Sequence, residues 1–198
     1  MTPDSLPDPL LVAGLVATAL ERIGAVHVIG GSFASSFYGE PRSTNDIDVV
    51  ADLSLDAARA LAEALGPQFY MSATAAAEAV RSGGSFNIID VRSAVKVDVF
   101  VAGEDALDRD RLRRRQRVQV TTSDGSIDLF VDTPEAVVLR KLEWFRRGGE
   151  TSERQWRDVV GVLRAQAGRL DRDYLTEWAD RVGVADLLRV AEEEAARG

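Results

Sequence analysis

The stretch from Ile29 to Val50 constrains this chain more than any other part of it. The β-branched run Val26 to Ile29 predicts a short strand, and Gly30 and Gly31 follow it directly. Two glycines let the backbone turn sharply and approach a ligand closely, and Ser32 is expected to cap a following helix. Unpaired N–H groups at a helix start attract anions, so Gly30, Gly31 and Ser32 are candidate phosphate-binding residues. The alternative is that these residues only connect a strand to a helix.

Two aspartates follow on the next predicted strand. Residues two apart share one face of a strand, so Asp46 and Asp48 point together while Ile47 and Val49 point to the core. Like charges about 4 Å apart repel by roughly 4 kcal/mol at an effective dielectric near 20, and a bound divalent cation would reverse this cost. Oxygen ligands suit Mg²⁺ or Mn²⁺. An exposed strand face with solvated acids is the alternative.

A third acid, Asp98, lies on a strand expected at 95–101. Valines alternate strictly there with Lys96, Asp98 and Phe100, which therefore occupy the opposite face. If this strand lies beside the strand of Asp46, three carboxylates converge. Two of them would bridge two metal ions, and Asp98 would hold one ion and take the proton of an attacking hydroxyl.

Three basic residues are further candidates. Of 24 basic residues only Lys96 and Lys141 are lysines, and both fall within the segments discussed here. A compact ammonium suits a phosphate oxygen, and chance placement with an ordinary salt bridge is the alternative for each lysine. Arg42 precedes Asp46 in a loop and could reach a phosphate or remain solvated.

Together, the Gly30-Gly31-Ser32 turn, the Asp46-Ile47-Asp48-Val49 strand and the later strand at Asp98 resemble the signature of the DNA polymerase beta-like nucleotidyltransferase superfamily. The segments 42–48, 96–100, 141–145 and 152–158 further resemble the minimal nucleotidyltransferases grouped with the AbiEii toxins. This resemblance extends from about Val26 to Leu188.

The resemblance implies transfer of a nucleoside monophosphate from a nucleoside triphosphate to an acceptor hydroxyl, with Mg²⁺ or Mn²⁺ held by Asp46, Asp48 and Asp98. It also implies that Lys141 and Asp158 support nucleotide binding. The acceptor could be RNA, a protein or a small molecule, and a toxin-like enzyme could have a cognate antitoxin.

Two other functions are compatible with parts of this pattern. One is a non-catalytic module of the same fold, antitoxin-like or regulatory, that binds a nucleotide or a protein without turnover. The other is a metal-dependent glycosyltransferase, which also uses Asp-x-Asp. Glycosyltransferases need a larger nucleotide-sugar domain before the motif, and only 45 residues precede Asp46.

Composition sets the remaining bounds. No run approaches the roughly 18 apolar residues that cross a bilayer, and the first residues lack the basic start of a signal peptide, so we expect a soluble cytoplasmic protein. The absence of cysteine excludes disulfides and thiolate chemistry. A net charge of −8 argues against a broad nucleic-acid footprint. The basic segment Arg109 to Arg117 could face phosphates locally, or could be a solvated helix end and loop.

The order of elements predicts an α+β protein, with a mixed-sheet α/β domain at 1–132 and a helical subdomain at 133–198. The resemblance implies that the first domain is a nucleotidyltransferase core. Strands are expected at 26–29, 46–49, 69–71, 85–90, 95–101, 117–121 and 127–131. Helices are expected after Ser32 and at 10–23, 55–65, 73–81, 134–147, 153–167, 173–182 and 185–196.

His27 is expected to be packed and hydrogen-bonded in its strand rather than catalytic. Trp144, Trp156 and Trp178 are expected to be core residues rather than base-stacking platforms.

Overall fold

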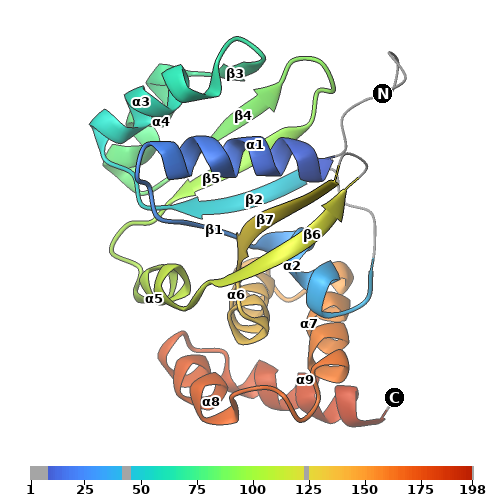
Figure 1. Ribbon diagram of the computed structural model, residues 1–198. Coiled ribbons are helices and arrows are strands. Elements are labelled where there is room, and N and C mark those ends of the chain that lie inside the picture. Colours follow the sequence, from blue (N-terminus) through green and yellow to red (C-terminus); the bar gives the residue numbers. More distant parts are fainter. Residues whose placement is uncertain (1–8, 42–45, 123–124, 198) are drawn as a thin grey trace. The chain divides into compact units, whose positions relative to one another are not determined.

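The computed structural model describes residues 9–41, 46–122 and 125–197. Within these ranges seven strands form one sheet in the order β3-β4-β5-β2-β1-β7-β6 (Figure 1). The strands are β1 (His27–Ile29), β2 (Asp46–Ala51), β3 (Phe69–Met71), β4 (Ser85–Asp90), β5 (Lys96–Val101), β6 (Gln116–Thr122) and β7 (Gly125–Val131). The pairs β2–β5 and β1–β7 are parallel and the other neighbours are antiparallel, which confirms the predicted mixed sheet.

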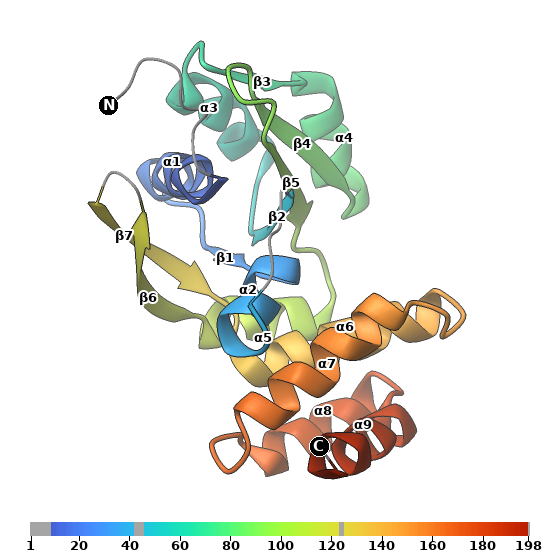
Figure 2. The same ribbon diagram turned by 90° about the vertical axis from the view of Figure 1, so that its right-hand side faces the viewer.

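The chain folds as two compact units. The sheet unit comprises Met1–Ile29 and Thr44–Val131, and the helical unit comprises Gly30–Ser43 and Asp132–Gly198. The sheet unit contains the strands and α1 (Pro9–Arg22), α3 (Leu55–Leu65), α4 (Ala73–Ser82) and α5 (Ala106–Arg114). The helical unit contains α2 (Gly31–Tyr38), α6 (Pro134–Arg147), α7 (Glu153–Ala165), α8 (Arg172–Arg181) and α9 (Ala185–Arg197). Helix α2 therefore packs with the C-terminal helices, against α6 and α7, although the chain places it between β1 and β2 (Figure 2).

Alternating side chains give the central strands a buried face. Ile47 and Val49 on β2 and Val97 and Val99 on β5 are at most 1% exposed, while Asp48 and Asp98 between them are partly exposed. Helix α1 lies across the sheet and contacts β2 and β7 with a face of small apolar residues (Figure 1). None of the described helices is both long and apolar enough to cross a membrane.

Side-chain caps set most of the helix starts. Ser54, Thr133 and Ser152 accept hydrogen bonds from backbone N–H groups three residues on. The expectation that Ser32 caps α2 is wrong. The N-cap is Gly30, which makes no side-chain cap, and Ser32 lies in the first turn of the helix.

Helix α5 was not predicted, because its sequence is dense in charge and shows little apolar periodicity. It is nevertheless regular. Asp105 caps it by accepting from the N–H of Asp108 at 2.9 Å, and the buried Arg111 donates to Asp108 at 2.6 Å.

His27 is a core residue, as expected. It is 1% exposed, its ring lies edge-on to Phe130, and its Nδ1 lies 3.3 Å from the carbonyl oxygen of Ala25. Its Nε2 is buried without a hydrogen-bond partner among the described residues. Burial lowers the pKa of His27 below its ordinary value of 6.5.

We expect His27 to make the fold sensitive to acid. Because the folded-state pKa is the lower one, the unfolded chain takes up the proton first as pH falls below about 6.5. The stabilising contribution of neutral His27 is therefore complete above that pH and is lost progressively below it. In His27→Leu the free energy of unfolding should fall less between about pH 7.5 and pH 5 than in the wild type. Urea denaturation followed by circular dichroism measures this, and identical pH profiles would contradict it.

Glycine at position 39 permits a close approach within the helical unit. A Cβ atom at Gly39 would lie 2.9 Å from the backbone nitrogen of Val162 and 3.1 Å from the carbonyl carbon of Gly161, both on α7. The N–H of Gly39 donates to the carbonyl of Ser35, and Gln166 Nε2 donates to the carbonyl of Tyr38. The C-terminal end of α2 is thus held directly against the backbone of α7.

We expect Gly39→Ala to destabilise the helical unit by about 1–3 kcal/mol, because backbone atoms cannot yield as a flexible side chain does. Gly103→Ala is the control, since its nearest neighbour, the Cα of Gly83, would lie at an ordinary 3.8 Å. Chemical denaturation of both variants gives the comparison. Equal stability of the two would show that the contact between α2 and α7 tolerates a methyl group.

Candidate active site

Strands β2 and β5 place three aspartates on one face of the sheet. In the parallel register Asp48 is directly opposite Asp98, and Asp46 is opposite Lys96. Asp46 is exposed, Asp48 is partly exposed, and the side chain of Asp98 is 18% exposed. Adjacent strands lie about 4.8 Å apart, so Asp48 and Asp98 are neighbours across the two strands on one face of the sheet.

Lys96 supplies positive charge within this acidic group. Its Nζ donates to Oδ2 of Asp98 at 2.7 Å, and its side chain is 40% exposed. The hydrogen bond to Asp98 raises the pKa of Lys96 above its ordinary value, and the charges of Asp98, Asp46 and Asp48 raise it further against the opposing effect of burial. Lys96 therefore interacts electrostatically with all three acids.

The donor set can be compared with the expected metal ion. Three carboxylates without softer ligands fit Mg²⁺ or Mn²⁺. Over the ranges that the structure covers, no group of three or more acidic, histidine or cysteine side chains is arranged to hold a metal ion. The carboxylate ligand type fits the predicted ion, but the described side chains are not arranged around one, and Lys96 is paired with Asp98 in this structure.

The glycine turn belongs to the helical unit and starts α2. Gly31 has φ = 56°, a left-handed backbone that glycine adopts readily, and it is the first helical residue. The first backbone bond that closes α2 runs from the N–H of Ala34 to the carbonyl of Gly30 at 3.1 Å. Early N–H groups at a helix start lack intrahelical partners, and no side chain caps this one. Gly30, Gly31 and Ser32 therefore lie at the start of a helix that no N-cap side chain closes.

Lys141 on α6 and Asp158 on α7 bond to each other. Nζ of Lys141 donates to Oδ2 of Asp158 at 2.7 Å and to Oε1 of Gln155 at 3.0 Å. The two charged side chains are only 7% and 9% exposed. Ser35 on α2 joins them, because its Oγ lies 3.3 Å from Oδ2 of Asp158. Sequence reasoning missed Ser35, an ordinary polar residue with no distinguishing local pattern, and it assigned no role in the site to Gln155, although that residue lies within the resembling segment 152–158.

The remaining basic candidates differ. Arg42 lies outside the described residues. Within the basic segment, four arginines pair with carboxylates: Arg109 with Glu104, Arg111 with Asp108, Arg113 with Asp110, and Arg117 with Asp128. This local neutralisation favours a structural role for the segment over phosphate binding.

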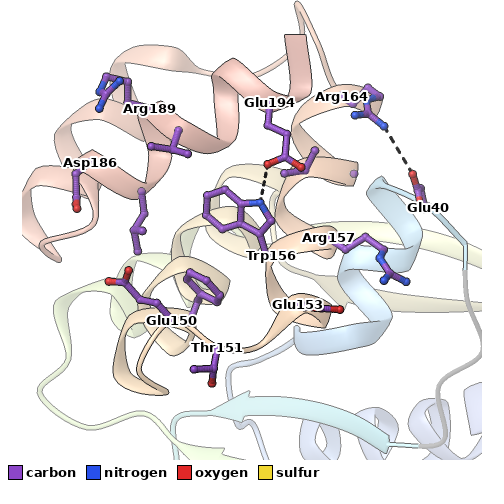
Figure 3. Close-up of a pocket in the computed structure, with 15 residues that line it drawn as sticks. Glu40, Glu150, Thr151, Glu153, Trp156, Arg157, Arg164, Asp186, Arg189 and Glu194 are labelled. Carbon is purple, nitrogen blue, oxygen red and sulfur yellow. Dashed lines mark hydrogen bonds and ion pairs between the residues drawn. The ribbon is translucent and has the colours of Figure 1, made fainter. Parts of the chain in front are cut away.

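The tryptophans occupy three environments in the helical unit. Trp178 is buried as expected, whereas Trp144 is 48% exposed with the guanidinium of Arg147 near its ring. Trp156 packs against Phe145 and donates from Nε1 to Glu194 at 2.8 Å. It lies in the wall of a pocket of about 790 Å³ between α7 and α9, whose rim carries charges of both signs (Figure 3). Among the predicted site residues that the structure describes, none lines this pocket.

No protein-family model and no curated protein matched the chain significantly. Solved structures do match it. An antigenic nucleotidyltransferase-like protein from Paracoccidioides brasiliensis is 16% identical, with a TM-score of 0.54 over 93% of this chain and 92% of that protein. The antibiotic-resistance factor ANT(2'')-Ia is 15% identical, with a TM-score of 0.48 over 96% of both chains. JHP933 from Helicobacter pylori is 11% identical, with a TM-score of 0.45 over 98% and 96%. The likeness to the Paracoccidioides protein shows that this chain has a nucleotidyltransferase fold.

Proposed function

We propose that the chain is a metal-dependent nucleotidyltransferase that moves a nucleoside monophosphate from a nucleoside triphosphate to an acceptor hydroxyl. The observation that carries this proposal is the pairing of Asp48 with Asp98 across two parallel strands, with Asp46 on the same face. Neighbouring carboxylates repel one another, and a bound cation would relieve the repulsion that Lys96, which is paired with Asp98, leaves among the three acids. The nucleotidyltransferase fold of the chain supports the same conclusion.

The proposed reaction is an in-line displacement at the α-phosphorus. A bond forms between the acceptor oxygen and the α-phosphorus while the bond from that phosphorus to the bridging oxygen breaks, and pyrophosphate leaves with the electron pair. Asp98 takes the proton of the acceptor hydroxyl, and its hydrogen bond from Lys96 fixes the direction of the carboxylate. Backbone N–H groups of Gly31 and Ser32 bind the phosphates.

A bound divalent ion, held by Asp46, Asp48 and Asp98, would neutralise the triphosphate and polarise the phosphorus under attack. Lys96 contributes a further point charge toward a phosphate oxygen.

The resemblance to the AbiEii group extends the proposal to a toxin-like cytoplasmic enzyme whose acceptor is RNA, a protein or a small molecule. A toxin of this kind would arrest growth when it is expressed alone, and a cognate antitoxin would relieve the arrest. Induced expression of the wild type and of Asp48→Asn in parallel tests this extension. Growth arrest by both proteins would show that toxicity does not depend on nucleotidyl transfer.

The direct test uses each ribonucleoside triphosphate labelled at the α-phosphate, with Mg²⁺ or Mn²⁺ and acceptors of the three classes. We expect label to enter one acceptor class with stoichiometric release of pyrophosphate.

The alternative is a non-catalytic module that binds a nucleotide or a protein. The ion pair between Asp98 and Lys96 favours this alternative, because Lys96 neutralises the Asp98 carboxylate without a metal ion. If calorimetry detects nucleotide binding but no acceptor leads to pyrophosphate release, the protein is a non-catalytic module.

A further inference from the structure

Helix α2 is too short to be stable alone. It has 8 residues, and isolated helices shorter than about 12–15 residues are marginal in water. Buried apolar residues, among them Phe33 and Ala34, supply part of its support. Its first turn contains Gly31 and Ser32, which the proposed function assigns to the phosphates. Whatever fixes α2 therefore also fixes the direction of these N–H groups.

A buried hydroxyl connects the first turn of α2 to α7. Ser35 is 2% exposed, and its Oγ lies 3.3 Å from Oδ2 of Asp158 and 3.0 Å from the carbonyl oxygen of Ser32. One side chain thus touches both the turn and an acid on the neighbouring helix.

Lys141 in turn holds that acid in place. Its 2.7 Å bond to Asp158 compensates a carboxylate that is only 9% exposed, and a buried carboxylate without this partner would be strongly disfavoured. We refer to Ser35, Lys141 and Asp158 as the α2 clamp. Its three members come from α2, α6 and α7, which all lie in the helical unit.

We propose that the α2 clamp positions the first turn of α2, and that Lys141 and Asp158 support nucleotide binding through this helix without touching the nucleotide. The inference rests on the proposed function for the identity of the ligand. Two observations favour positioning over direct contact. The charges of Lys141 and Asp158 are directed at each other, and both side chains are nearly buried, whereas Lys96 on β5 is 40% exposed.

Amide hydrogen exchange of the nucleotide-free protein tests the clamp directly. In Ser35→Ala we expect the amides from Ala34 to Gly39 to exchange about tenfold faster, the scale set by losing one hydrogen bond to a charged group. Asp158→Asn should have a larger effect in the same direction. Thr176→Ala is the matched control, because it removes a hydroxyl that donates to the carbonyl of Arg172 on α8 and should leave α2 unchanged.

Nucleotide binding supplies a second readout. With the four ribonucleoside triphosphates and Mg²⁺ as probes, Ser35→Ala should raise KM about tenfold and change kcat by less than about threefold, because bound phosphate reorders the turn. Unchanged exchange of α2 in both Ser35→Ala and Asp158→Asn would overturn the clamp. A raised KM in Lys141→Met with unchanged amide exchange of α2 would also overturn the clamp, because it would indicate that Lys141 contacts the nucleotide directly. Faster exchange in a protein that binds no nucleotide would support the clamp and count against the proposed function alone.

Discussion

Asparagine at position 48 is expected to abolish nucleotidyl transfer, lowering the rate by at least about 10³-fold, while the protein remains folded. Asp48 faces Asp98 across the β2–β5 pair and lies beside Asp46 on the same face. A neutral amide is a much weaker ligand for a divalent ion than a carboxylate, and loss of several kcal/mol of transition-state stabilisation corresponds to roughly three orders of magnitude in rate. Pyrophosphate release from labelled nucleoside triphosphates measures the effect.

The fold should tolerate this change, because Asp48 is partly exposed and its replacement relieves repulsion between neighbouring acids. Asp56→Asn is the control, since Asp56 is an exposed acid paired with Arg59 on α3. We expect the control to retain wild-type activity and both variants to retain the wild-type circular dichroism spectrum. Persistent activity in Asp48→Asn would contradict the assignment of Asp46, Asp48 and Asp98 as the metal-binding residues of the active site.

The second large effect concerns stability. Lys141→Met leaves Asp158 as a nearly buried carboxylate without its ammonium partner, and we expect the free energy of unfolding to fall by about 3–5 kcal/mol. All three tryptophans of the chain lie on α6, α7 and α8, so intrinsic fluorescence follows the helical unit. Denaturation monitored by fluorescence therefore reports the unfolding of the unit that contains the pair.

Two controls separate burial from charge. Arg189→Met breaks an exposed pair with Glu193 and should cost no more than about 1 kcal/mol. The double variant Lys141→Met with Asp158→Leu removes both charges and should recover much of the loss, because apolar replacement of a buried pair is often neutral. If Lys141→Met were as mild as Arg189→Met, the pair would contribute little to stability.

The sheet and the placement of the acids could be predicted because they depend on local patterns. Alternation along β2 and β5 determines which side chains share a face, and this put Asp46, Asp48 and Asp98 on the face opposite the buried valines. The order of strands with their turns was enough to predict a mixed sheet, and the parallel β2–β5 register then brought the acids together.

Other features depend on contacts between distant segments. The bond between Lys141 and Asp158 joins two helices, and neither residue carries a local signal for its partner. The membership of α2 in the helical unit depends on a backbone approach at Gly39 that needs the structure of α7 to be seen. Helix α5 is stabilised by a cap and charge pairs rather than by an apolar stripe, so its periodicity is weak.

The discontinuous make-up of the helical unit has a consequence for biosynthesis. The segment Gly30–Ser43 leaves the ribosome well before Asp132–Gly198, which contains both helices that α2 packs against. At about 5–20 residues per second, α2 waits on the order of ten seconds for these partners. The nascent chain therefore completes its glycine turn only after α6 and α7 have been translated, so premature termination anywhere before them leaves the turn unfinished.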